Sequence, residues 1–238
     1  MKKLKLLYLA FIVLLLATSC KEKSNSGTSS IAKAFEKALE NPETTTSISL
    51  KAQGIEEIPN SINGRFINLI QIILDDNNIK FLPESIGEIN KLKYLHLSKN
   101  KLETLPKSIG NLNNLEWLYA YSNEITNLPN VAFNFQKNAI VDLKWNKIES
   151  IPQEFCNSQF GTLHLTASPL TELPENFGSL KELKELNIAN TNISDLPDSF
   201  YNLQKLSILD IRGTKLTKKH YEMIKKKIPN CTIKSDFE

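Results

Sequence analysis

The chain has 238 residues, of which 29 are lysine or arginine and 26 are aspartate or glutamate, so its formal net charge is +3. Lys2, Lys3 and Lys5 lie in a segment that we expect to be removed, which would leave a mature chain with no net charge. Because the chain also lacks a long basic stripe, it does not have the electrostatic footprint of a nucleic-acid-binding protein. We expect no nucleic acid among its partners.

Residues 1–19 predict a secretory signal peptide. Lysines precede an apolar run from Leu6 to Ala17, which is shorter than the roughly 20 residues that a membrane-spanning helix needs. The run ends in small residues directly before Cys20. This junction resembles the lipobox of bacterial lipoproteins. The resemblance implies cleavage before Cys20, acylation of that cysteine and a lipid anchor in the cell membrane or outer membrane, with surface exposure left open. The alternative is an ordinary signal peptide with a chance cysteine.

The next two segments predict a tether and a cap. Residues 20–29 are polar and have no periodicity, which is typical of a flexible linker. Residues 30–44 predict an N-terminal capping helix, because Pro42 follows a stretch whose apolar side chains share one helical face. Those apolar residues are Ile31, Phe35, Ala38 and Leu39.

Residues 45–216 carry a leucine repeat with a period of about 23 residues. In one unit the recurring residues are Leu92, Leu95, Leu97, Asn100, Leu102, Leu105, Pro106, Ile109 and Leu112. The same template fits eight units, which open at Thr45, Leu69, Leu92, Leu115, Asn138, Phe160, Leu183 and Leu206. This pattern resembles that of the leucine-rich repeat family and, together with the lipobox, a bacterial member of it.

The resemblance implies an α/β fold, a horseshoe-shaped solenoid with a parallel β-sheet on its concave face. Elementary geometry agrees, because Leu95 and Leu97 would point to one face of a short strand and His96 to the other. Strands stacked about 4.8 Å apart would bury a continuous leucine column, whereas one unit alone could not bury its apolar face. The leucine column is therefore the predicted core.

Three kinds of residue recur around the strands and in the returning segments, and we interpret all of them as structural. Proline after leucine or isoleucine fixes φ where the chain leaves for the convex side. An amide side chain supplies both the donors and the acceptors that a buried turn needs, and such asparagines are Asn77, Asn100, Asn123 and Asn146. The glycines of the return are expected to permit tight turns, and they are Gly64, Gly87, Gly110 and Gly178.

Residues 217–238 predict a C-terminal cap, which a solenoid needs because its last unit would otherwise expose leucines. The stretch 218–227 is typical of a basic amphipathic helix, and 228–233 indicates a final strand. We interpret the lysines of this helix as a solvated face rather than a nucleic-acid site.

The sequence offers no motif that predicts catalysis, such as G-x-S-x-G, H-E-x-x-H, C-x-x-C or G-x-G-x-x-G. His96 and His164 lie three units apart, about 14 Å by strand spacing, and so cannot share a metal ion. Cys156 and Cys231 are also separated by several strands, and we predict two unpaired, buried thiols. We therefore expect no enzyme activity, no cofactor and no metal.

The concave face carries the predicted binding residues. Both tryptophans and three of the six tyrosines fall at strand or turn positions that point toward this face, all in three consecutive units. Exposed aromatic residues at the centre of a concave surface are typical binding anchors, although cross-strand packing alone is an alternative. The rings of Trp117 and Trp145 are expected to approach each other as a platform. The predicted partner-binding residues are Tyr94, His96, Trp117, Tyr119, Tyr121, Asp142, Lys144 and Trp145.

Together these features predict a monomeric, non-catalytic binding module that recognises a protein or glycan and meets the membrane only through its lipid anchor. The first alternative is a structural spacer or assembly subunit that uses its convex or lateral surface. The second is a module lent to a catalytic partner. One fold hosts many ligands, so the residues of the face, and not the fold, must identify the partner.

Overall fold

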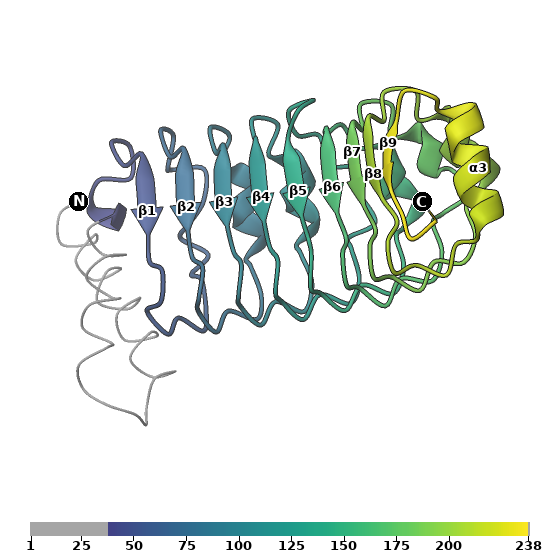
Figure 1. Cartoon of the computed structure of the whole chain (residues 1–238). Helices are drawn as coiled ribbons and strands as arrows, with labels where there is room; N and C mark the ends of the chain where they lie inside the picture. The colour runs from purple at the N-terminus through teal and green to yellow at the C-terminus, as the bar shows by residue number, and fades with distance from the viewer. Residues whose placement is uncertain (1–37, 238) are drawn as a thin grey trace.

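The computed structural model describes residues 38–237, and this part of the chain forms an open solenoid (Figure 1). Within it, nine short strands make one parallel sheet in which each strand pairs with its neighbours in sequence. The strands are β1 (Ser47–Ser49), β2 (Gln71–Ile73), β3 (Tyr94–His96), β4 (Trp117–Tyr119), β5 (Ile140–Asp142), β6 (Thr162–His164), β7 (Glu185–Asn187), β8 (Ile208–Asp210) and β9 (Thr232–Lys234). The predicted solenoid, with its parallel sheet on the concave face, is confirmed.

The register of the strands explains the core. Each strand has three residues, of which the middle one points into the solenoid and the outer two point to the concave face. Leu95 of β3 lies opposite Leu118 of β4, and Leu118 lies opposite Val141 of β5. The middle residues of β2 to β8 are all fully buried. They stack as one apolar column, in which each buried side chain contributes roughly 1.5–3 kcal/mol relative to an exposed one.

Short 3₁₀ helices form the opposite, convex side of the described solenoid and lie behind the sheet in Figure 1. A proline with φ from −71° to −65° directly precedes all of them except η4, so the ring sets the direction in which the chain leaves the sheet. The helices are η1 (Glu84–Glu88), η2 (Lys107–Asn111), η3 (Gln153–Asn157), η4 (Phe177–Ser179) and η5 (Asp198–Asn202).

The convex segment after Pro129 departs from this pattern. Residues 130–137 contain no helix. The rings of Phe133 and Phe135 lie there instead, with centroids 5.0 Å apart, and Phe133 also lies 5.0 Å from Phe155 of the next unit. Both rings of this segment are buried in the core although the segment has no helix.

The repeated asparagines form a ladder of buried hydrogen bonds. The Asn100 Nδ2 donates to the carbonyls of Leu74 and Leu97 at 2.9 and 3.0 Å, and its Oδ1 accepts from the backbone N–H of Ile79 at 3.0 Å. The other three asparagines make corresponding bonds. The structural interpretation of the asparagine row is confirmed, because each amide satisfies backbone groups of two adjacent units.

The four glycines of the return lie in turns or 3₁₀ helices, as predicted. None of them has a positive φ, so a left-handed backbone is not what requires glycine there. A Cβ added at Gly87 would lie 2.3 Å from the carbonyl oxygen of Ser108, and one added at Gly178 would lie 1.8 Å from that of Ser199. At Gly64 the nearest atom would be 3.4 Å away. At Gly87 and Gly178, close approach of neighbouring units is what requires glycine.

The C-terminal cap consists of α3 (Lys218–Lys227) and β9. The helix has the predicted bounds. The strand begins at Thr232 rather than near Ile228, because Ile228 ends the helix and its N–H donates to the Ile224 carbonyl at 2.8 Å. Ile224 and Ile228 are both buried, so α3 covers the apolar end of the solenoid. Figure 1 shows the helix at that end, beside the last strands.

The N-terminal predictions fall almost entirely on residues before 38. Residues 38–40 are helical and are followed by a turn, where the predicted capping helix was expected to end. The predicted signal peptide, Cys20, the tether and the rest of the capping helix lie outside the described residues. No helix within residues 38–237 is long and apolar enough to cross a bilayer.

Both described cysteines are free, as predicted. Cys156 is fully buried, and burial raises the pKa of its thiol to about 12. Cys231 is only partly buried, so the prediction of a buried thiol is wrong for this residue, although burial still raises its pKa to about 11. Neither thiol is activated as a nucleophile, because a raised pKa keeps the sulfur protonated at neutral pH.

Candidate recognition face

The parallel register brings most of the predicted binding residues together on the concave face. Tyr94 lies beside Trp117, and His96 beside Tyr119, on strands β3 and β4. Tyr119 in turn lies beside Asp142 on β5. Since the middle residue of each strand is buried, these side chains project from the concave face in two rows that cross the strands.

Four of these residues form an aromatic cluster: Tyr94, His96, Trp117 and Tyr119. The Trp117 ring lies 4.8 Å from that of Tyr94 and is nearly parallel to that of Tyr119, at 5.8 Å. The His96 ring meets that of Tyr119 edge to face at 5.2 Å. Trp117 nevertheless remains 41% exposed. The rings therefore support one another and still present a large apolar surface to solvent.

A second group, the turn cluster, consists of Tyr121, Lys144 and Trp145, in the turns after β4 and β5. The rings of Tyr121 and Trp145 meet edge to face at 6.0 Å. The Nζ atom of Lys144 lies 5.8 Å from the Tyr121 ring centroid and 5.5 Å from that of Trp145. Both distances are within the range of a cation–π interaction.

The predicted platform of Trp117 and Trp145 is wrong, because these two rings make no contact in the described structure. The residue of β5 that lies opposite Trp117 is Ile140, and Trp145 comes five residues later. Trp145 thus sits in the turn at the far end of its strand. The face carries two adjacent aromatic clusters rather than one platform.

Trp145 has a backbone conformation that disfavours tryptophan. Its φ is 54°, in the left-handed region, which costs a residue with a side chain roughly 1–2 kcal/mol. Every unit makes the same turn, and the equivalent residues are Ala52, Asp76, Lys99, Ser122, Ala167, Asn190 and Gly213. Trp145 is 54% exposed, so core burial does not offset the cost. Neither the turn nor the core explains this tryptophan, and such departures cluster at functional sites.

The carboxylate of Asp142 connects the turn cluster to a histidine. Its Oδ2 lies 3.0 Å from Lys144 Nζ and 3.9 Å from His164 Nδ1, and His164 Nε2 lies 3.1 Å from a Glu185 oxygen. Burial opposes the charged form of His164, but Asp142 and Glu185 together outweigh it and raise its pKa. Burial likewise opposes ionisation of Asp142, but His164 and Lys144 outweigh it and lower the pKa of that carboxyl.

His96 occupies the same strand position as His164 but has the opposite shift. Burial lowers the pKa of His96 and outweighs the attraction of Asp75, whose nearest oxygen lies 3.8 Å from His96 Nδ1. Its Nε2 is buried without a hydrogen-bond partner. His96 is therefore held in its neutral form within the aromatic cluster.

His164 and Glu185 were not among the predicted binding residues, although the structure places them beside Asp142. The signal that could have identified His164 is its strand position, the third residue of β6, which matches that of His96 in β3. The sequence does not indicate the contact between His164 and Glu185, because that contact depends on the directions of side chains on two strands. Within residues 38–237, no group of three or more histidine, cysteine or acidic side chains could hold a metal ion.

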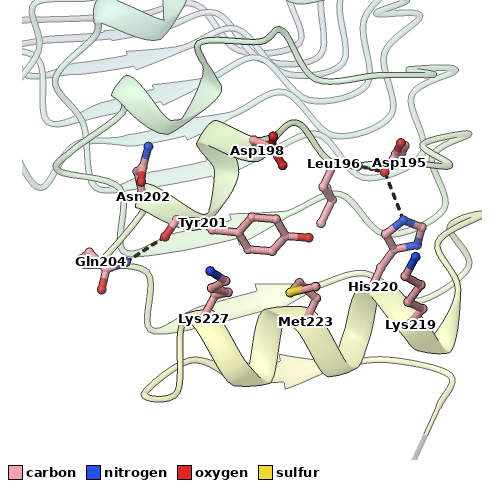
Figure 2. A pocket seen from close by; sticks show the side chains of 10 residues that line it. All are labelled: Asp195, Leu196, Asp198, Tyr201, Asn202, Gln204, Lys219, His220, Met223 and Lys227. Carbon is pink, nitrogen blue, oxygen red and sulfur yellow. Dashed lines mark hydrogen bonds and ion pairs between the residues drawn. The ribbon is translucent and has the colours of Figure 1, made fainter.

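A groove of about 700 Å³ lies between η5 and α3, far from these clusters (Figure 2). It has Asp195 on one side and Lys219 and Lys227 on the other. His220 Nε2 lies 3.1 Å from an Asp195 oxygen, and the Thr217 N–H donates to His220 Nδ1 at 3.0 Å. The Nε2 contact ties the start of α3 to the repeats, and the Nδ1 contact caps the first turn of the helix itself. No serine or cysteine lines the groove.

Comparison with known protein families agrees with the repeat geometry. A family model described as leucine rich repeat matches residues 67–125 and 161–216. The chain is a leucine-rich repeat protein. Domains of this family are typically non-catalytic and generally mediate protein binding. No curated protein sequence matches this leucine-rich repeat protein.

Solved structures share the fold of this leucine-rich repeat protein at low sequence identity. The leucine-rich repeat domain of the type III effector XopL is 21% identical, with a TM-score of 0.68 over 94% of this chain and 87% of that chain. A Shigella effector domain is 21% identical, with a TM-score of 0.66 over 90% and 91%. YopM from Yersinia enterocolitica is 19% identical, with a TM-score of 0.65 over 86% and 41%. These similarities show a common fold.

Proposed function

We propose that this leucine-rich repeat protein is a non-catalytic binding module that recognises a protein or glycan partner through its concave face. The observation that carries the proposal is Trp145, a half-exposed tryptophan in a left-handed turn whose equivalents are small or polar. Because this residue weakens its own backbone and buries little surface, it contributes little to folding. Contact with a partner is the role that accounts for it.

The aromatic cluster supports the same proposal. If its rings served cross-strand packing alone, they would cover one another, yet Trp117 remains 41% exposed. Its contacts with Tyr94 and Tyr119 hold the indole in place before any ligand arrives. Such a preorganised ring loses little side-chain entropy on binding, which makes it a suitable anchor.

A comparison of two aromatic substitutions tests the proposal against the spacer alternative. The mature chain would serve as bait for envelope extracts, beside a Trp117→Ala/Trp145→Ala variant. Phe81→Ala is the matched control, since Phe81 is 56% exposed but lies between β2 and η1, after the strand and turn positions of the concave face. We expect the double variant to lose its specific partner and the control to retain it. Retention by both would favour a lateral or convex binding surface.

We further propose that the protein acts as a monomer and is attached to the cell membrane or outer membrane through acylated Cys20. The small residues before Cys20 and the polar stretch after it support this proposal. Cys20→Ala should abolish incorporation of a labelled fatty acid and cleavage at that site, because the thiol accepts an acyl chain. Ser24→Ala in the predicted tether is the control. Undiminished label in Cys20→Ala would contradict the anchor.

A further inference from the structure

Most of the charged side chains of the concave face are paired with one another. Along β1 to β8 and the turns after them, the lysines and arginine are Lys51, Lys99, Lys144 and Arg212, and each lies within 3.5 Å of a carboxylate of the same face. Lys234, at the end of β9, makes no ion pair in the described structure. Of the remaining carboxylates, Glu185 lies 3.1 Å from His164, whereas Asp75 lies 3.8 Å from the neutral His96 and accepts a hydrogen bond from the Ser98 N–H at 2.8 Å. Around the exposed rings of Trp117 and Trp145, the cationic side chains of the face are therefore already compensated by carboxylates.

Lys144 restricts the ligand further. Its ammonium group lies over both rings of the turn cluster and 3.0 Å from Asp142. A ligand cation at Tyr121 or Trp145 would meet this positive charge, and a ligand anion at Lys144 would compete with Asp142. The ligand cation is repelled, and the ligand anion must break an existing ion pair and lose its own hydration, so neither charge adds much net binding energy.

We propose that the ligand of this face is an uncharged saccharide, an inference that rests on the proposed function of the concave face. The partly positive C–H groups on one side of a pyranose ring complement the negative face of an indole, so Trp145 and Trp117 offer stacking surfaces. A ligand that brings no charge leaves the ion pairs of the face intact.

The ion pairs supply the hydrogen-bonding groups that recognition of a saccharide also needs. Neighbouring hydroxyls of a sugar both donate and accept hydrogen bonds, and a carboxylate beside an ammonium group matches them. Asp142 with Lys144 adjoins Trp145, and Asp76 with Lys99 lies in the turns after β2 and β3, beside the aromatic cluster. An apolar peptide would instead leave these polar groups desolvated without partners.

The test uses an array of defined oligosaccharides, probed with the mature chain. The array would hold neutral hexaoses of glucose, mannose, galactose and xylose, together with sulfated, uronic-acid and free-amine counterparts. We expect binding to at least one neutral hexaose and at least tenfold weaker binding to its charged counterparts. The dissociation constant should change less than about twofold between 50 and 500 mM NaCl, because no charge on the ligand is screened.

Two pairs of variants locate the site. Trp145→Ala and Lys144→Met should each weaken binding of the neutral hexaose by at least about tenfold. Phe81→Ala and Lys147→Met are the matched controls, since Phe81 is exposed away from the face and Lys147 pairs with Glu124 beyond the asparagine ladder. The controls should bind as the unaltered chain does.

Each failure has a distinct signature. An array that is silent for neutral hexaoses, or binding only of charged ones, would overturn the saccharide inference. If the Trp117→Ala/Trp145→Ala variant nevertheless fails to bind an envelope partner that the unaltered chain binds, the concave-face proposal stands although the saccharide inference fails. Hexaose binding that survives in that variant would instead overturn both, because the ligand would sit elsewhere.

Discussion

The concave face has an aromatic half, on β3 and β4 and the turns after β4 and β5, and a polar half, on β6 to β8. Both halves lie over the same column of fully buried middle residues. In the aromatic half the rings of Trp117 and Trp145 remain exposed, whereas in the polar half His164 pairs with Glu185 and Asp210 with Arg212. Since the polar half folds in the same way without such rings, the scaffold does not require them. The proposed function therefore depends on positions that the repeat leaves free.

Removing a core leucine from each half should have the largest effect. Leu97→Ala and Leu165→Ala occupy equivalent positions in different halves, and both leucines are fully buried. Each substitution should reduce the free energy of unfolding by roughly 2–5 kcal/mol, because a cavity between stacked units cannot collapse. Urea denaturation measures this loss, with Lys99→Ala as a control that should change it little. A much smaller loss for Leu165→Ala would show that the two halves do not share one core.

Partner affinity should separate the halves most clearly. Trp117→Ala should weaken binding more than tenfold, corresponding to about 2 kcal/mol for a central anchor, without unfolding the protein. Thr162→Ala, in the same row of the polar half, should leave affinity unchanged. Titration followed by tryptophan fluorescence provides the measurement, because both tryptophans of the chain lie in the aromatic half. Equal weakening by the two substitutions would contradict the division of the face.

The turn of Trp145 should separate stability from binding. Trp145→Gly removes a left-handed strain of roughly 1–2 kcal/mol and an edge-to-face contact of roughly 0.5–1.5 kcal/mol, so the free energy of unfolding should change by no more than about 1.5 kcal/mol. Gly213 already occupies the equivalent turn, with φ 66°. Calorimetric unfolding and partner titration should show a stable protein that binds at least tenfold more weakly. A large loss of stability would mean that Trp145 is a structural residue.

The smallest effect concerns pH and the two histidines. The pKa of His164 is raised, so its stabilisation is complete below the unfolded value of about 6.5 and is lost as pH rises through the folded value. The pKa of His96 is lowered, so stability is lost as pH falls below about 6.5. His164→Gln should therefore destabilise the protein more at pH 5.5 than at pH 8.5, and His96→Gln should show the reverse. Urea unfolding at both values tests the signs, and identical pH dependence would contradict them.

Much of the fold follows from the sequence because spacing along the chain determines which side chains share a face. Leu95 and Leu97 recur at the strand period, and Asn100 marks the turn, so the sheet, the core and the asparagine ladder were predictable from one repeat unit. The bounds of α3 also followed from its amphipathic pattern. These features depend on local periodicity and on the burial that stacking imposes on it.

Other features depended on distances between units, which spacing along one unit does not specify. The need for glycine at Gly178 arises from a carbonyl of the next unit, and the separation of Trp117 from Trp145 arises from the length of a strand and its turn. The position of His164 between Asp142 and Glu185 depends on side-chain directions across three strands. The sequence by itself determined the scaffold and the face that carries the aromatic residues. Only the tertiary structure decided how those residues are grouped, because rotamers and packing between units set the contacts of exposed side chains.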